Sequence, residues 1–144
     1  MTDGEFKILN HSAKGFEKFS DGKQIQKNFS PDSVLKKDDE YILIEHETEP
    51  NRKTIVADVF KAAYFLQENK KGILVIAMTP KGKSSFESYP NHVIPYFQWL
   101  KQRTNLTEVF FIREKDYCLN GKALEINGAE FRKKCTSLNY LCKK

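Results

Sequence analysis

The stretch from residue 41 to residue 47 limits the folds open to this chain most strongly, because acidic residues end an apolar run there. Residues 41–44 are apolar and rich in β-branched side chains, which favours a strand. Side chains alternate between the two faces of a strand. Glu45 and Glu47 should therefore share one face, and His46 should point to the other.

The preceding segment is predicted to pair with this strand as a hairpin. Residues 29–36 can form the partner strand, and the polar residues 36–39 form a link of hairpin length. Folding back there places Asp32 opposite residues 43–45, close to Glu45. Two carboxylates held so close repel each other unless a cation lies between them. Mg²⁺ prefers oxygen ligands of this kind, so the hairpin predicts a divalent metal site.

A helix and a second strand are predicted after the hairpin. Residues 54–68 carry apolar side chains at helical spacing, and Asn51 or Thr54 is the expected N-cap. Residues 72–78 are continuously apolar, as expected of a central strand buried on both faces. The order strand, helix, strand implies a right-handed crossover. We therefore expect an α/β fold with a mixed central sheet flanked by helices, in a single domain over residues 1–144.

The remaining elements are predicted from shorter patterns. Residues 92–103 indicate a second helix with Pro95 near its first turn, and residues 108–112 indicate a buried strand. The other expected elements are a short strand at 6–9, a short helix or structured loop at 15–20, a strand at 23–28, a short segment at 122–126 and a helix at 129–141.

The order Pro31-Asp32, then Glu45-His46-Glu47, then a helix resembles the PD-(D/E)xK nuclease superfamily. That family includes many restriction enzymes and DNA-repair nucleases, and the resemblance covers roughly residues 25–78. It implies a restriction-endonuclease-like fold and a metal-dependent DNA endonuclease that hydrolyses phosphodiester bonds. Glu47 stands where the family usually has lysine, although some restriction enzymes carry Glu or Gln there.

The resemblance also implies roles for individual residues. Asp32 and Glu45 would hold Mg²⁺ or Mn²⁺, and Glu47 would orient or deprotonate a water molecule or bind a second metal. Lys53 or Lys61 on the following helix would replace the missing lysine or contact a phosphate. Family members often take a further acid from an earlier helix.

The candidate for that further acid is Glu17. The chain carries 24 Lys and Arg against 19 Asp and Glu, a net charge of +5, which suits a polyanionic partner. Arg52, Lys53, Lys81 and Lys83 are the candidate nucleic-acid contacts. DNA is the expected partner and RNA stays open. A homodimer is expected if both strands of a duplex are cut.

Three other interpretations of the acidic residues stay open. The chain can be a catalytically inactive nuclease-fold module that binds nucleic acid or a protein, which the glutamate at position 47 favours. It can also be a small-molecule or protein-binding α/β domain whose resemblance to nucleases is accidental. Finally, acids at a strand end are often solvated surface charges.

Composition sets the cellular expectations. No apolar run approaches membrane-spanning length, and residues 1–10 are too acidic and mixed for a signal peptide, so a cytoplasmic protein is expected. Cys118, Cys135 and Cys142 are odd in number and lack C-x-x-C spacing. They therefore predict neither a disulfide framework nor a zinc site.

Overall fold

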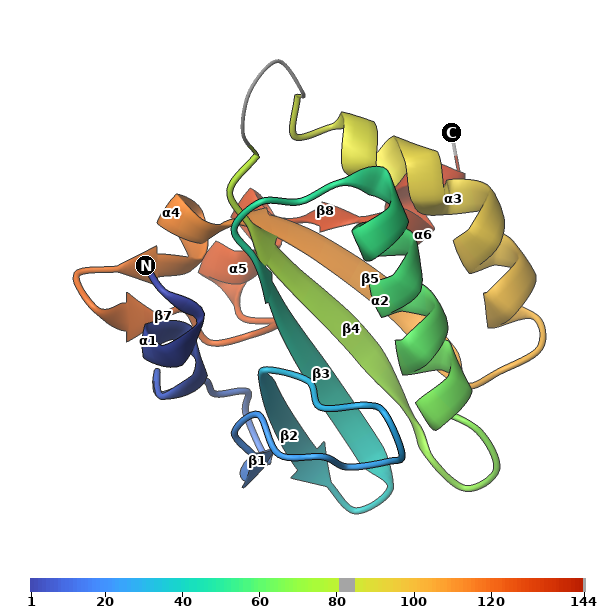
Figure 1. The fold of residues 1–144 in the computed structure, drawn as a ribbon, viewed down its shortest axis with the longest axis horizontal. Helices are drawn as coiled ribbons and strands as arrows, with labels where there is room; N and C mark the ends of the chain where they lie inside the picture. The colour runs from blue at the N-terminus through green and yellow to red at the C-terminus, as the bar shows by residue number, and fades with distance from the viewer. Residues whose placement is uncertain (81–84, 144) are drawn as a thin grey trace.

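A mixed six-stranded sheet lies at the centre of the molecule (Figure 1), in a computed structural model that describes residues 1–80 and 85–143. Strands β3, β4 and β5 run parallel, whereas the β1–β2, β2–β3 and β5–β8 pairs are antiparallel. The predicted mixed sheet is confirmed. In order across the sheet the strands are β1 (Glu17–Ser20), β2 (Ser33–Lys37), β3 (Glu40–Glu47), β4 (Lys71–Met78), β5 (Leu106–Arg113) and β8 (Thr136–Ser137).

Helices cover both faces of this sheet. One face carries α2 (Arg52–Phe65), α3 (Ser88–Lys101) and α6 (Leu138–Cys142), and α2 and α3 lie side by side in front of the strands in Figure 1. The other face carries α1 (Asp3–Lys7), α4 (Glu114–Tyr117) and α5 (Ala129–Lys134). A separate pair of short strands, β6 (Cys118–Leu119) and β7 (Lys122–Ala123), follows α4.

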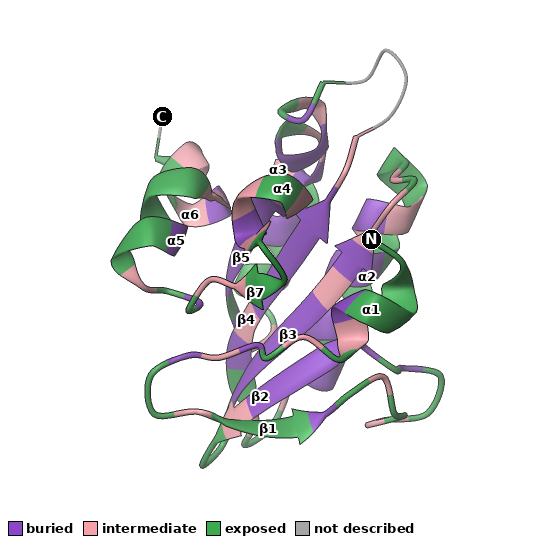
Figure 2. Ribbon diagram, turned by 90° about the vertical axis from the view of Figure 1, so that its left-hand side faces the viewer, coloured by how far each residue is buried: buried purple, intermediate pink, exposed green. Residues whose placement is uncertain are grey.

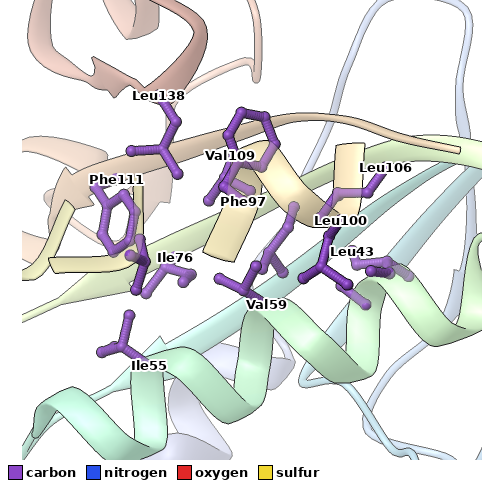
Figure 3. Packing of buried hydrophobic residues seen from close by; sticks show 14 of the residues in the cluster. Leu43, Ile55, Val59, Ile76, Phe97, Leu100, Leu106, Val109, Phe111 and Leu138 are labelled. Atoms are coloured by element: carbon purple, nitrogen blue, oxygen red, sulfur yellow. The ribbon is translucent and has the colours of Figure 1, made fainter. Parts of the chain in front are cut away.

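The larger core lies between the sheet and helices α2 and α3 (Figure 3). Ile55 of α2 and Phe97 of α3 are fully buried there against sheet residues such as Leu43. A second core on the opposite face is built around Phe6 and Phe131. Strand β4 contributes to both cores, so the prediction that residues 72–78 form a central strand is confirmed.

The predicted hairpin is present, with a tighter turn than expected. Lys37 already pairs with Glu40, so only Asp38 and Asp39 form the turn, and Asp38 takes a left-handed backbone (φ 52°). The pairing of Ser33 with Ile44 sets the register of the hairpin. This register is what brings the segment before β2 level with the end of β3.

Strands β3 and β4 approach each other unusually closely at Gly72. A Cβ atom placed on Gly72 would lie 2.0 Å from the carbonyl oxygen of Tyr41. Only glycine fits there, because any side chain would meet backbone that cannot move aside. Helix α2 then connects these strands, and it begins after Asn51, whose side chain accepts a hydrogen bond from the Thr54 N–H at 2.9 Å.

The N-terminal predictions were wrong. Residues 6–9 do not form a strand, because Thr2 caps helix α1 by accepting a hydrogen bond from the Glu5 N–H and the Phe6 ring turns into the core. Residues 15–20 contain strand β1 instead of a helix, since residues 17–20 pair with β2. Residues 23–28 form a loop with a single bridge between Gln26 and Phe29.

Two later predictions also needed correction. Pro95 lies inside α3 and not in its first turn, because the helix begins at Ser88. The expected helix over residues 129–141 is interrupted by β8. The interruption arises because Thr136 and Ser137 pair with β5, and the Ser137 side chain then caps α6 by accepting from the Tyr140 N–H.

Two absences complete the description of the chain. Cys118, Cys135 and Cys142 are all free thiols. Within residues 1–80 and 85–143, no helix combines the length and the apolar character needed to cross a bilayer.

Candidate active site

Asp32 and Glu45 meet at the open end of the β2–β3 hairpin. The Asp32 N–H donates a hydrogen bond to Glu45 Oε1 at 3.1 Å, and the His46 N–H donates to Asp32 Oδ2 at 2.7 Å. A backbone N–H of β3 therefore holds the Asp32 carboxyl group, and the backbone N–H of Asp32 holds the Glu45 carboxyl group. The structure brings these two sequence-predicted residues together, and the register of the hairpin is the cause.

Glu47 lies on the same strand face and meets an acid of helix α2. Its carboxyl group is hydrogen-bonded to that of Asp58. Asp58 is buried, and its Oδ2 atom has no hydrogen-bond partner among the described residues. A buried oxygen left without a partner costs free energy, so this atom marks a place where a proton or a cation would be stabilised. We call Asp32, Glu45, Glu47 and Asp58 the acidic cluster.

Burial and mutual repulsion make the acidic cluster hold protons. Burial and then the Asp32 charge raise the pKa of Glu45 to about 8. Burial and then the charges of Glu45 and Glu47 raise the pKa of Asp58 to about 10. Burial is also the main reason why the pKa values of Asp32 and Glu47 are raised. At neutral pH the cluster therefore keeps protons that solvent-exposed carboxylates would lose.

Two lysines lie near the acidic cluster. Lys7 of α1 has its Nζ 3.9 Å from Asp32 Oδ1. Lys61 of α2 is exposed, and its charge lowers the pKa of Glu45, so its field reaches the site. Lys61 was predicted from the sequence, whereas Lys7 was not.

None of the other predicted site residues that the structure describes lies in the acidic cluster. Arg52 and Lys53 are exposed in the first turn of α2, and Lys81 and Lys83 lie outside the described residues. Glu17 does not join the acidic cluster. It is exposed on β1 opposite Lys36, toward the other end of β2 from Asp32.

His46 points away from the acidic cluster, as strand alternation predicted. Its ring is buried against Phe6, with ring centroids 4.4 Å apart. Nδ1 lies 2.8 Å from Asp3 Oδ1 and Nε2 lies 2.7 Å from Glu114 Oε1. Glu114 also accepts a hydrogen bond from Thr79 Oγ1 at 3.0 Å. The imidazole thus links α1 to the ends of β3, β4 and β5 from behind the site.

Sequence reasoning missed Asp58, although a signal was present. Asp58 falls three residues after Ile55 and four before Ala62, on the side of α2 that carries its apolar residues. An acid at a core-facing helix position needs a partner or a proton. Asp3 and Glu114 offered no comparable signal, because only the tertiary fold brings them to His46.

The donor set suits a hard divalent ion in its chemistry. Four carboxyl groups, one of them with an unpartnered buried oxygen, supply the oxygen ligands that Mg²⁺ and Mn²⁺ prefer. In the part of the chain that the structure describes, however, no three His, Cys, Asp or Glu side chains are arranged to hold a metal. The arrangement is that of a protonated cluster, in which a cation would have to replace protons.

Comparison with known proteins gives no family: no family model, no curated protein and no solved structure matches the chain. Its function is therefore inferred from the side chains and their surroundings.

Proposed function

We propose that the protein is a metal-dependent nuclease of restriction-endonuclease-like fold, which hydrolyses phosphodiester bonds at the acidic cluster. Asp32 and Glu45 are the proposed metal ligands, and Glu47 and Asp58 complete the site. DNA is the proposed substrate. The order of elements, hairpin, helix and parallel strand, supports this proposal together with the Pro31-Asp32 and Glu45-His46-Glu47 motifs.

The half-buried contact between the Asp32 N–H and the Glu45 carboxyl group is the observation that carries the proposal. Ordinary surface carboxylates do not lie side by side with a pKa raised to about 8. Structural ion pairs perturb pKa values too, but in those cases a cation compensates the acid. Here the compensating Lys61 is exposed and is the smallest of the named influences on Glu45. Such a cluster is destabilising unless it holds protons or binds a cation, and cation binding is the role proposed for it.

The chain's own groups would prepare the site for reaction. The His46 N–H orients the Asp32 carboxylate, and the Asp32 N–H orients Glu45. Glu47 would accept a proton from water once it is itself deprotonated; burial raises its pKa, and its hydrogen bond with Asp58 opposes that rise. Lys61 would lie near a bound phosphate. When bound, Mg²⁺ or Mn²⁺ would lower the pKa of a water molecule and offset negative charge in the transition state.

One observation favours a second candidate, a nuclease-fold module that binds without cutting. Glu47 replaces the usual lysine and is engaged by Asp58. A group occupied in this way is less available to water or metal. Metal binding and cleavage must therefore be measured separately.

Calorimetric titration of Mn²⁺ tests the metal site. Wild-type protein should bind Mn²⁺ and release protons, seen as a heat that depends on the buffer's ionisation enthalpy, because raised-pKa carboxyls must deprotonate first. Asp32→Asn and Glu45→Gln should weaken binding at least about 10-fold, since each removes a charged oxygen ligand. The same variants should lose cleavage of plasmid DNA in Mn²⁺.

Glu40→Gln is the matched control, because Glu40 lies on the same strand and is exposed near Lys71. It should bind and cleave as the wild type does. Glu47→Lys distinguishes the two candidates. If Glu47 is a metal ligand, this substitution should impair metal binding. If Glu47 instead belongs to a site that has lost its activity, the lysine should preserve cleavage or restore it. A wild-type protein that binds metal and cuts no DNA or RNA is the binding module. Absence of metal binding refutes the nuclease.

A further inference from the structure

The outward side of α2 and α3 carries four exposed aromatic residues. The exposed fractions are 39% for Phe60, 67% for Tyr64, 41% for Tyr96 and 51% for Trp99. Aromatic rings of this size are normally buried when they have no external role, because each removes a large apolar area from water. These four residues are called the aromatic surface below.

The aromatic surface is continuous across the two helices. Phe60 and Tyr96 bring their ring centroids to 6.3 Å across the α2–α3 contact. Tyr64 lies one helical turn after Phe60, and Trp99 lies about one turn after Tyr96. Helices α2 and α3 lie side by side in Figure 1, so the four rings extend over one side of the molecule.

Helices α2 and α3 carry exposed cations and no exposed acid, and the exposed acids Glu68 and Glu87 lie just beyond the end of α2 and at the start of α3. Within α2 and α3, both fully described, the only acid is Asp58, and its side chain is buried. The cations of these helices and of the turn that follows α3 are Arg52, Lys53, Lys61, Lys101 and Arg103. The Arg103 guanidinium stacks 4.1 Å from the centre of the Trp99 ring, as a cation–π pair.

Lys61 connects the aromatic surface to the acidic cluster. With Lys27, Phe60 and Tyr64 it lines a hollow of about 310 Å³. The charge of the same lysine reaches Glu45. A polymer lying along the aromatic surface would therefore pass a cation that also acts on the proposed catalytic site.

We infer that the aromatic surface binds single-stranded nucleic acid, with bases stacked on the rings and phosphates near the cations. Interleaved aromatic and basic side chains are the recurring solution for sequence-tolerant binding of single strands. A duplex fits less well, because its bases already stack on one another. A second copy of this chain also fits less well, because a symmetric contact would bring like charges together. The inference takes nucleic acid as the ligand from the proposed function, and it specifies that the bound nucleic acid is single-stranded.

Trp99 is the only tryptophan of the chain, so its fluorescence reports directly on this surface. Wild-type protein in EDTA, where cleavage is suppressed, is titrated with a 15-nucleotide oligodeoxythymidylate and with a duplex of equal length. The single strand should quench Trp99 and bind more tightly than the duplex. Tyr64→Ala and Tyr96→Ala should each weaken binding by roughly 5- to 150-fold, the range measured for loss of one stacked base.

Matched controls separate stacking from general effects of substitution. Tyr140→Ala removes a tyrosine of similar exposure (60%) from α6 and should leave the affinity unchanged. Arg103→Gln should lower the slope of log affinity against log salt by about 0.7, the value for one phosphate contact on a single strand. Lys122→Gln, an exposed cation on β7, should leave that slope unchanged.

Each remaining outcome decides the inference. Absence of binding at low salt, equal affinity for the duplex, or unchanged affinity in Tyr64→Ala and Tyr96→Ala overturns it. If the wild type self-associates and Tyr96→Ala abolishes that association, the aromatic surface binds a second copy of this chain and the inference is overturned. Glu45→Gln keeps the quenching in either case, because Glu45 lies outside the surface. Quenching without cleavage therefore refutes only the nuclease, and cleavage without quenching refutes only this surface.

Discussion

Asp58 belongs to the acidic cluster although it lies within the apolar stripe of α2. It occupies a core-facing position of α2, is buried, and leaves its Oδ2 atom without a hydrogen-bond partner among the described residues. A hydrophobic residue there would pack better, so retaining an acid costs stability. In the acidic cluster this cost has a chemical use, since the carboxyl group can lose its proton to solvent and bind a cation in its place.

The pH dependence of stability should expose this residue. The folded protein raises the pKa of Asp58 from 3.8 to about 10. Its stabilising contribution as a proton-binding group is therefore complete below about pH 3.8 and is lost as the pH rises toward 10. From pH 5 to 9 the wild type should lose unfolding free energy relative to Asp58→Asn, by at most about 1.4 kcal/mol per pH unit for one proton.

Urea unfolding at pH 5, 7 and 9 measures this difference. Glu40→Gln, on the exposed start of β3, should follow the wild type at every pH. Parallel curves for wild type and Asp58→Asn would show that Asp58 titrates alike in the folded and unfolded chain.

At the scale of elements, the sequence predicted the parts whose patterns are long. The apolar run of residues 72–78 predicted β4 to within one residue, and the stripe over residues 54–68 predicted α2 to within three residues at each end, because period and length agree there. The predictions of short elements failed, since the conformation of such elements depends on partners distant in the sequence. Phe6 enters a helix because it packs against His46, and residues 136–137 leave one because they pair with β5.

The candidate site divides along the same line. Asp32, Glu45 and Glu47 could be predicted, because a hairpin and strand alternation are local rules. Asp58 could have been predicted only by noticing that an acid occupies a core-facing position in the apolar stripe of α2. Lys7 and Glu114 could not be predicted, since only the tertiary fold brings α1 and the end of β5 to the hairpin.

The contact between β3 and β4 depends on a single glycine. Gly72→Ala would place a methyl group against the Tyr41 carbonyl oxygen and force the two strands apart. We expect a loss of about 3 kcal/mol of unfolding free energy, measured by urea denaturation. Gly4→Ala is the control: its nearest neighbour is 3.9 Å away, and alanine in α1 should add up to about 1 kcal/mol. Unchanged stability of Gly72→Ala would contradict the close approach.

At the scale of the whole molecule, polar residues gather where the parallel strands end. Glu45 and Glu47 end β3, Thr79 follows β4, and Glu114 follows β5. The carboxyl ends of parallel strands are where α/β proteins place their sites. The remaining length of these strands is almost entirely buried, so the sheet serves as a rigid support for that edge.

Metal binding at this edge should stabilise the whole fold. At about 100 times its dissociation constant, Mn²⁺ should add about 2.7 kcal/mol, which raises the Tm of a chain this size by about 5–10 °C. The rise should be larger at pH 8 than at pH 5, because protons compete for the same carboxylates. Thermal melts with and without EDTA measure it. An equal rise in Glu45→Gln would place the metal elsewhere.

The two outer strands of the sheet determine how copies of this protein can associate. Strand β8 has two residues, and β1 has four, of which Glu17, Lys18 and Phe19 are exposed (Figure 2). Lys18 also pairs with Asp21 at 2.9 Å, which places charge along that edge. Short, charged edges give another chain little backbone to hydrogen-bond with. Edge-to-edge sheet extension, and the aggregation that follows from it, is therefore disfavoured by the architecture itself.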